Sequence, residues 1–544
     1  MLFLNDIHHN WTEEKIAENT ITLLYKGSEK FAHNIINVVS HCVDLETEIK
    51  NHLQSNHDFT SGYIETSTHA VAWVDHIRSW PIFYNMCTGT LSASNNARNL
   101  KNQKIDENSC LEFAMSGYVT GKNTLYENIK CLQPGEFLIW EKNNLKLTLV
   151  RYYQYSPNMN DTTQTWDRNK QKLDQILNNL TKKVIQNANG RPIWIPLSGG
   201  LDSRILLCKL HEHQYPNLHT FTYGPRYNFE SKIAKKVAKK LNVPWYFICP
   251  PKKQIKEYFN NEDRKKFWYT TDGYKSIASM REFSALMYLR DKKIIHRNAI
   301  ILNGQSGDYI TGNHISKLWR QDREFSPDDL FQILFDKHYE LWSTLKKQEN
   351  LEIIKERIIA LLPDNWTQAK TGIDFASLEE IWEFDARQIC LVANGQKSYD
   401  YFGYDWEMPL WEKELVDFCE KLPFDQKIDQ SLYKEYLKDY NYFGLFSEKE
   451  SHIWRWPMPM LWVIPIAQII GLFFGKQKKN NFYALMRYHG HYSNQFYNFS
   501  WKTHKKTYAI ARNVMSLNVR EFIIENPKVF PSKIKNMLVI QNVD

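Results

Sequence analysis

A glycine-bearing loop, Ser198 to Ser203 (SGGLDS), constrains the fold of this 544-residue chain more than any other feature. The apolar run 192–197 before it predicts a strand, and residues 202–213 predict a helix. Two glycines at such a junction let the backbone approach a phosphate, and the helix N-terminus offers N–H donors to an anion. Ser198 and Ser203 add hydroxyl donors, and Asp202 adds a carboxylate suited to Mg²⁺. Because no Gly-Lys-Ser/Thr follows, this loop differs from the one that serves γ-phosphoryl transfer in P-loop enzymes.

Strand and helix patterns alternate around this loop. Strands are predicted at 218–223, 245–249 and 299–303, with helices at 229–241 and 281–290. This spacing predicts an α/β fold with a doubly wound parallel sheet, whose ligands bind at the carboxyl ends of the strands. Beyond about residue 327 the pattern is nearly all helical.

The chain is long enough for more than one domain. Residues 1–155 are rich in short strands and turn signals, and the polar stretch 156–170 is typical of a linker. We expect the parallel-sheet domain to occupy 171–450 and a helical C-terminal extension to occupy 451–544.

A second glycine-flanked carboxylate follows the strand predicted at 299–303. The turn Asn303-Gly304-Gln305-Ser306-Gly307-Asp308 lies about a hundred residues after the first loop, with Gly312 and His314 behind it. Carboxyl ends of parallel strands share one edge of a sheet, so Asp202 and Asp308 are predicted to hold Mg²⁺ against a pyrophosphate.

The two loops and the segment 403–412 (GYDWEMPLWE) resemble, in order and spacing, the synthetase domain of the asparagine synthetase family. The resemblance covers roughly residues 65–445. It implies a PP-loop ATP-pyrophosphatase domain that uses ATP and Mg²⁺ to form an acyl-adenylate, which ammonia or an amine then attacks. It also implies that Asp202 and Asp308 are the metal ligands and that Lys434 contacts the reacting phosphoryl or acyl group. The residues implied to bind ATP and pyrophosphate are Ser198, Gly199, Gly200, Leu201, Asp202, Ser203, Thr222, Tyr223, Gly224, Gly304 and Gly307. Asn228, which opens the next helix, fits a helix N-cap as well as an ATP contact.

The segments 75–84, 117–119 and 132–135 resemble the glutaminase half of the same family, which has an α/β/β/α Ntn-hydrolase-like fold. That glutaminase depends on a cysteine at position 2, and this chain has Leu2. Arg78 or Ser79 stands where the family has glycine. The resemblance therefore implies a degenerate N-terminal domain that does not hydrolyse glutamine.

Two departures concern the acceptor. Gln305 stands where asparagine synthetases carry a glutamate thought to accept the proton of the attacking nitrogen, and an amide cannot take that role. Asp405-Trp406-Glu407 replaces the family's Glu-x-Arg, so we expect Asp405 and Glu407, with Lys434, to act at the acceptor end of the pocket. Aspartate is therefore a doubtful substrate.

The runs 409–418 and 432–436 resemble the bacterial branch of the family that is associated with surface polysaccharides. This favours a uronic acid as acceptor, with nitrogen from ammonium, a separate glutaminase or an amine. The alternatives are an asparagine synthetase acting on aspartate, a cyclase of the lasso-peptide or β-lactam type, and a catalytically inactive scaffold. Among weaker candidates, Glu383 and Arg387 are interpreted as a solvated i,i+4 pair, and Lys397 as a surface residue.

Composition limits the location and partners. The net charge of +8 is thin for this length and is interpreted as spread over many helices, which gives nucleic-acid binding little support. The eight cysteines show no CxxC pair and the N-terminus shows no signal peptide, so we expect a cytoplasmic protein. The uncharged segment 456–475 contains three prolines and is too short in helix to span a bilayer. It is expected either to pack against the protein or to contact the inner face of the membrane.

Overall fold

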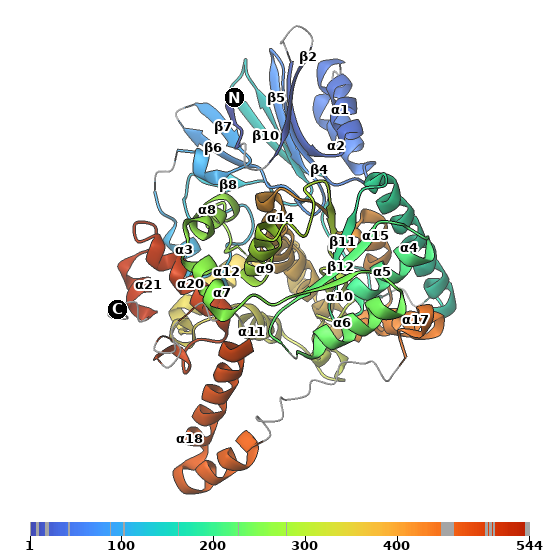
Figure 1. Cartoon of the computed structure of the whole chain (residues 1–544). Coiled ribbons are helices and arrows are strands. Elements are labelled where there is room, and N and C mark those ends of the chain that lie inside the picture. The colour runs from blue at the N-terminus through green and yellow to red at the C-terminus, as the bar shows by residue number, and fades with distance from the viewer. Residues whose placement is uncertain are drawn as a thin grey trace.

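The computed structural model describes residues 2–6, 10–16, 21–41, 44–87, 89–101, 104–160, 163–226, 228–278, 280–447, 462–494, 499, 503 and 506–538. Within them lie two sheets in the N-terminal part and one in the centre of the chain (Figure 1). Helices make up most of the described chain beyond the third sheet. The mixed α/β class with a parallel sheet is confirmed.

The first N-terminal sheet is antiparallel and has six strands in the order β10-β9-β5-β4-β3-β2. Helices α1 (Glu29–His41) and α2 (Leu45–Gln54) pack on one face of it, around a core that includes Phe31, Ile35 and Trp73. The strands are β2 (Thr12–Ile16), β3 (Ile21–Gly27), β4 (Thr60–Glu65), β5 (His69–Val74), β9 (Glu136–Glu141) and β10 (Lys146–Arg151).

The second N-terminal sheet has four strands in the order β1-β7-β6-β8. These are β1 (Leu2–Leu4), β7 (Thr90–Ser94), β6 (Phe83–Cys87) and β8 (Ile129–Cys131), of which β1 and β7 run parallel. Helix α3 (Glu107–Ser116) lies between β7 and β8 in the chain. It begins at Asp106, whose carboxylate accepts the Ser109 N–H, and ends at Gly117 with a left-handed φ of 88°.

The central sheet is parallel, with five strands in the order β13-β12-β11-β14-β15. Its strands are β11 (Ile193–Pro196), β12 (Leu218–Tyr223), β13 (Trp245–Ile248), β14 (Ile300–Leu302) and β15 (Asp405–Glu407). Five helices alternate with the strands: α5 (Asp202–Glu212), α6 (Phe229–Lys240), α7 (Lys252–Asn260), α8 (Glu262–Thr271) and α9 (Met280–Asp291). The strands β11 to β14 and the helices α5, α6 and α9 match the prediction, with element ends shifted by at most one residue, whereas α7 and α8 were not predicted.

Two further details differ from the sequence-based expectations. Strand β15 lies in the region predicted to be nearly all helical, and it adds to the sheet through residues that pair with the distant β14. Helix α4 (Trp166–Ala188) begins inside the predicted linker, because an amphipathic pattern with buried Leu173, Ile176 and Leu180 starts there.

The remaining described helices are α10 (Gly307–Ile310), α11 (Pro327–His338), α12 (Gln348–Ile359), α13 (Gly372–Glu383), α14 (Lys397–Phe402), α15 (Lys413–Glu420), α16 (Phe424–Lys427), α17 (Ser431–Tyr440), α18 (Val463–Asn494), α20 (Val514–Glu525) and α21 (Ser532–Met537). A π-helical segment, Phe384–Ala393, continues α13. Helices α20 and α21 return to α3 (Figure 1), where the rings of Phe522 and Phe530 pack at a tilt against Phe113 with centroid distances of 5.0 and 5.6 Å.

Direct contacts join the N-terminal sheets to the central part. Arg151 on β10 makes an ion pair of 2.7 Å with Asp385, and His76 Nε2 donates to the Trp411 carbonyl at 2.8 Å. One buried hydrophobic cluster runs through both parts. The two parts therefore share a core, and the predicted domain limits remain a prediction.

Candidate active site

Asp202 and Asp308 meet where the adjacent strands β11 and β14 end. The backbone N–H of Asp308 donates to Asp202 Oδ2 at 2.9 Å, and the Tyr433 hydroxyl donates to Asp202 Oδ1 at 3.2 Å. Each carboxylate follows a glycine turn at the start of a helix: Asp202 begins α5, and Asp308 lies in the first turn of the short helix α10. The juxtaposition predicted from the two loops is thus present in the structure.

Two glycines make this close approach possible. A Cβ atom on Gly304 would lie 2.8 Å from the Ser203 nitrogen, and one on Gly307 would lie 2.7 Å from Asp202 Cγ. Neither distance is tolerable for a carbon atom. Any side chain at these positions would push the second loop away from Asp202, which explains why both positions carry glycine.

The electrostatics of this pair suit a cation. Burial, and secondly the charge of Asp308, raise the pKa of Asp202 to about 7. Burial acts in the same direction on Asp308, but the hydrogen bond and charge of His314 outweigh it and lower the pKa of Asp308. A divalent cation would supply the counter-charge that Asp202 lacks.

Mg²⁺ fits this donor set, because it takes one or two carboxylates and fills its other positions with phosphate oxygens and water. Over the described part of the chain, no three His, Cys, Asp or Glu side chains cluster as a self-sufficient metal site. An ion bound by Asp202 and Asp308 would therefore depend on a phosphate ligand.

The SGGLDS loop is shaped by its own polar groups. The Ser198 N–H donates to Ser203 Oγ at 3.1 Å, and the Gly200 N–H donates to Ser198 Oγ at 3.0 Å. The buried guanidinium of Arg204 donates to the Gly199 carbonyl at 2.7 Å. Both serine hydroxyls therefore hold the turn, which leaves their predicted role as phosphate donors open.

The end of β12 lies beside this loop. Thr222 Oγ1 donates to the Leu197 carbonyl at 2.6 Å and accepts from Trp245 Nε1 at 2.9 Å, so its hydroxyl ties three strands together. Tyr223 donates to Glu282 at 3.1 Å. Gly224 has a φ of +137°, which a side chain rarely adopts.

Asn228 caps helix α6. Its side chain accepts the Ser231 N–H at 2.6 Å, so the N-cap alternative is confirmed.

Lys434 lies on α17, one residue after Tyr433, but it faces another direction. Its Nζ donates to the Asp429 carbonyl at 2.5 Å, and burial lowers its pKa. The structure places Tyr433, not Lys434, in contact with Asp202. The sequence reasoning missed Tyr433, although its position beside the predicted lysine was a signal.

Asp405 and Glu407 are not brought to the Asp202–Asp308 pair. Both line a cavity of about 720 Å³ between strands β2 and β3 of the six-stranded sheet, α4 and β15. Asp405 pairs with Arg191 at 2.6 Å, and Glu407 Oε1 accepts from Asn187 at 3.1 Å. In the described residues, the cavity lining includes no member of either glycine loop. A shared role with Asp202 therefore gains no geometric support.

Gln305 makes a side-chain contact next to Asp308. Its Oε1 accepts from Gln396 Nε2 at 3.1 Å, and Gln396 Oε1 in turn accepts from Asn303 Nδ2 at 3.0 Å. The Gln305 amide is thus held in a network of neutral groups, and an amide does not act as a proton acceptor.

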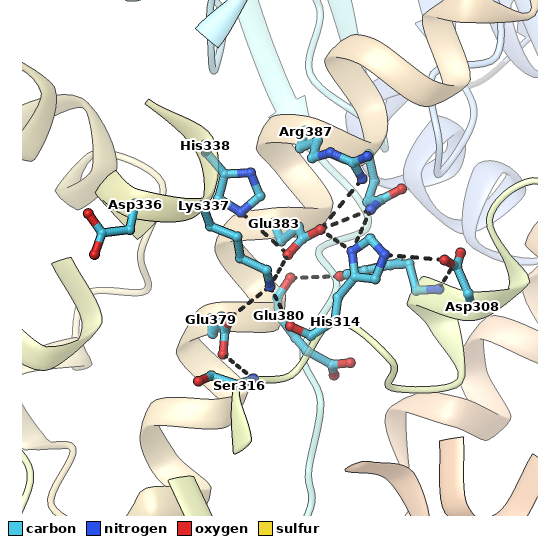
Figure 2. Close-up of polar contacts among 12 residues, drawn as sticks. Asp308, His314, Ser316, Asp336, Lys337, His338, Glu379, Glu380, Glu383 and Arg387 are labelled. Carbon is cyan, nitrogen blue, oxygen red and sulfur yellow. Dashed lines mark hydrogen bonds and ion pairs between the residues drawn. The ribbon is translucent and has the colours of Figure 1, made fainter. Parts of the chain in front are cut away.

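A buried charge network lies behind Asp308 (Figure 2). His314 Nε2 is 3.4 Å from Asp308 Oδ2, and its Nδ1 hydrogen-bonds Glu383. Lys337 joins Glu383 at 3.0 Å and Glu379 at 2.9 Å. Burial alone would lower the pKa of His314, but its hydrogen bonds to Asp308 and Glu383 outweigh burial and raise this pKa to about 9. His314 therefore carries a positive charge that faces Asp308 at neutral pH.

The expectation of a solvated Glu383–Arg387 pair is wrong. The Glu383 side chain is 1% exposed, and Arg387 is 3.7 Å away as only one of several cations around it. The reason is that His314 and Lys337 reach α13 from distant elements and bury its carboxylates.

The surface interpretation of Lys397 is wrong too. This residue is 2% exposed, and burial lowers its pKa to about 8.

Arg78 has a left-handed φ of +52° and is buried. This conformation is one that glycine adopts without strain and that an arginine rarely adopts. The guanidinium donates to the Leu132 carbonyl at 3.4 Å. An arginine side chain therefore occupies space that a glycine would leave empty.

The protonation of Glu407, which lines the 720 Å³ cavity, should make the stability of the folded protein depend on pH. Burial raises the pKa of Glu407 to about 8, far above the ordinary 4.5. The folded state thus favours the protonated form, and the stability this confers is lost as pH rises from about 4.5 to about 8. We expect the melting temperature of Glu407→Gln to exceed that of the wild type by an amount that grows between about pH 5 and pH 9. Glu349→Gln, at an exposed position, is the control. A constant difference across this pH range would contradict the burial of the Glu407 carboxyl.

Comparison with known protein families gives a match in the central part of the chain. Residues 177–441 match the family model described as asparagine synthase. No curated protein sequence matches the chain.

Two solved structures are similar over part of their length. One is glutamine phosphoribosylpyrophosphate amidotransferase from B. subtilis complexed with ADP and GMP, and the other is described as the allosteric regulatory enzyme of purine biosynthesis. Each is 12% identical and covers 55% of this chain, with a TM-score of 0.17. The match spans 59% and 58% of those chains, under two thirds of either. A TM-score this low establishes no shared fold.

Proposed function

We propose, from the premise that residues 177–441 form an asparagine synthase domain, that this protein is an ATP-dependent amide-forming ligase. The observation that carries the proposal is the contact between Asp202 and Asp308, from two glycine loops at the carboxyl ends of neighbouring parallel strands. A doubly wound sheet binds its ligands at this edge. In this proposal, residues 171–450 are a PP-loop synthetase domain and residues 1–155 a degenerate glutaminase-like domain.

The proposed reaction has two steps. A carboxylate oxygen attacks the α-phosphorus of ATP, which gives an acyl-adenylate and pyrophosphate, and ammonia or an amine then displaces AMP and loses one proton. When bound, ATP supplies the adenylyl group and Mg²⁺ neutralises the departing pyrophosphate. Asp202 and Asp308 would hold the ion, and the N–H groups at the start of α5 would face the phosphates. Gln305, whose side chain is an amide, cannot accept the proton of the attacking nitrogen.

The nitrogen source in this proposal is ammonium, a separate glutaminase or an amine. Leu2 forms part of strand β1, where it pairs with Ser92, and it offers no nucleophile. Burial raises the pKa values of three of the described thiols, Cys110, Cys208 and Cys419, to about 12. A glutaminase needs a reactive thiolate, whereas burial keeps these three thiols in the protonated form at neutral pH.

The acceptor in this proposal is a uronic acid of a surface polysaccharide or of its precursor. Support comes from the resemblance of 409–418 and 432–436 to that branch. Aspartate as acceptor, a peptide or β-lactam cyclase, and an inactive scaffold are the competing functions.

ATP–pyrophosphate exchange tests the proposal. We expect exchange to require Mg²⁺ and to rise at least tenfold with uronic acids or their nucleotide sugars, but not with aspartate. Amide formation should then proceed with ammonium and not with glutamine alone. Exchange with aspartate would favour the asparagine synthetase alternative, and exchange stimulated by a peptide would favour a cyclase. Absence of Mg²⁺-dependent ATP binding would leave the scaffold.

A further inference from the structure

Helix α18 exposes an unusual amount of apolar surface. It projects away from the rest of the protein (Figure 1). Leu472 is 84% exposed, Phe473 77%, Phe474 70% and Trp462, just before the helix, 71%. Three more exposed apolar residues are Ile464, Ile466 and Ile469. Only Val463 and Ala467, four residues apart, are buried between residues 462 and 474. This segment therefore packs along one narrow stripe and leaves the rest of its apolar surface uncovered.

The chain changes direction within α18. Gly475 has φ 82° and ψ 168°, which are not helical. Beyond it, Lys479 Nζ donates to Gln468 Oε1 at 2.8 Å, and a Cβ atom on Gly471 would lie 2.9 Å from the Lys479 side chain. Residues 462–479, here called the α18 tip, thus bring an apolar segment and the lysines Lys476, Lys478 and Lys479 together.

The charge of the surrounding sequence is one-sided. Residues 451–520 contain ten of the chain's 69 Lys and Arg and none of its 61 Asp and Glu. This excess is larger than the net charge of +8 of the whole chain. The interpretation of a charge spread thinly over many helices is therefore wrong, because it averaged over a chain whose basic excess is local.

We propose that the α18 tip inserts into the surface of a lipid bilayer that carries anionic headgroups. Exposed Leu and Phe side chains gain from transfer into the acyl boundary, Trp favours the headgroup level, and lysines nearby attract anionic lipid. The absence of any acidic residue from 451–520 removes the repulsion that such a surface would otherwise cause.

The tip lies on the membrane in this proposal and does not cross it. None of the helices in the described ranges has the length and apolar character needed for a transmembrane span. The apolar part of the tip, 462–474, is also shorter than the roughly 20 residues that a span requires. Residues 456–461 of the predicted apolar segment lie outside the described residues.

Vesicle co-sedimentation of the full-length protein tests this inference. The wild type should bind vesicles of phosphatidylcholine with about 30% phosphatidylglycerol, and bind pure phosphatidylcholine at least tenfold more weakly. The variant L472S/F473S/F474S should bind anionic vesicles about 100-fold more weakly. The variant K476Q/K478Q/K479Q should lose about 100-fold on anionic vesicles and little on neutral ones.

Matched control variants distinguish insertion of the α18 tip from non-specific binding of the protein to vesicles. Leu145→Ser and Met86→Ser change exposed apolar residues elsewhere, and K252Q/K253Q/K256Q changes three exposed lysines on α7. These variants should bind vesicles as the wild type does. Circular dichroism and thermal melts should show all variants folded, because the tip residues contribute little to the core.

Three results would overturn the inference. They are equal binding of the tip variants and the wild type, equal loss in the control variants, and concentration-dependent self-association without vesicles that the L472S/F473S/F474S variant abolishes. The last result would assign the tip to contact between two copies of this chain. Since vesicle binding needs neither ATP nor an acceptor, its outcome is independent of the proposed ligase activity.

Discussion

Replacing Asp202 by asparagine should reduce ATP–pyrophosphate exchange by roughly a thousandfold, the loss expected when a metal-held phosphate clamp is removed. The substitution preserves the shape of the side chain but removes the negative charge of the carboxylate that accepts the Asp308 backbone N–H at 2.9 Å. We expect the same variant to bind ATP more weakly in the presence of Mg²⁺ and to respond less to added Mg²⁺. Exchange kinetics and equilibrium binding of ATP measure the two effects.

Stability measurements keep this prediction specific. Because burial and the charge of Asp308 raise the pKa of Asp202 to about 7, its ionised form is a cost to the folded state above that pH. The melting temperature of Asp202→Asn at about pH 8 should therefore equal or exceed that of the wild type. The control Asp417→Asn changes a partly buried carboxylate that pairs with Lys413 within α15, and it should leave exchange unchanged. Undiminished exchange in Asp202→Asn would contradict the placement of the metal.

The largest stability loss is expected from Lys427→Met. Lys427 Nζ lies 2.5 Å from Glu380 Oε2, and both side chains are almost wholly buried. Tyr155 donates to the same oxygen at 3.2 Å. Without the lysine, an uncompensated carboxylate remains in the core, and the free energy of unfolding should fall by about 3–5 kcal/mol. Denaturant titration followed by tryptophan fluorescence measures this loss.

A second variant tests the electrostatic origin of the loss. Lys427→Met combined with Glu380→Gln removes both charges, and we expect it to regain most of the lost stability. Lys413→Met, which breaks a more exposed pair with Asp417, should cost less than about 1 kcal/mol. If the double variant is no more stable than Lys427→Met, the loss comes from packing around the methionine and not from the buried charge.

The sequence predicts those features of this protein that depend on local structure. Strand β11, the SGGLDS loop and α5 follow one another within about twenty residues, and each has its own local signal. The contact of Asp202 with Asp308 was predictable because parallel strands end at a common edge. The N-cap at Asn228 is equally local, although the sequence could not choose between a cap and an ATP contact.

Features that depend on distant partners were not predictable. Glu383 and Arg387 have the spacing of a solvated helix pair, yet His314 and Lys337 come from other elements to bury Glu383. Strand β15 is three residues long, and only its pairing with β14 makes it a strand. Lys434 matches a motif in sequence, but the direction of its side chain depends on how α17 packs.

Adenylation of a carboxylate is the central step of the proposed reaction, and oxygen-isotope transfer tests it most directly. With an acceptor carboxylate labelled with ¹⁸O and with ammonium as nitrogen donor, one labelled oxygen should appear in AMP. The pyrophosphate should remain unlabelled, because the carboxylate oxygen attacks the α-phosphorus. Label found in inorganic phosphate together with ADP would show attack at the γ-phosphorus and would contradict the account.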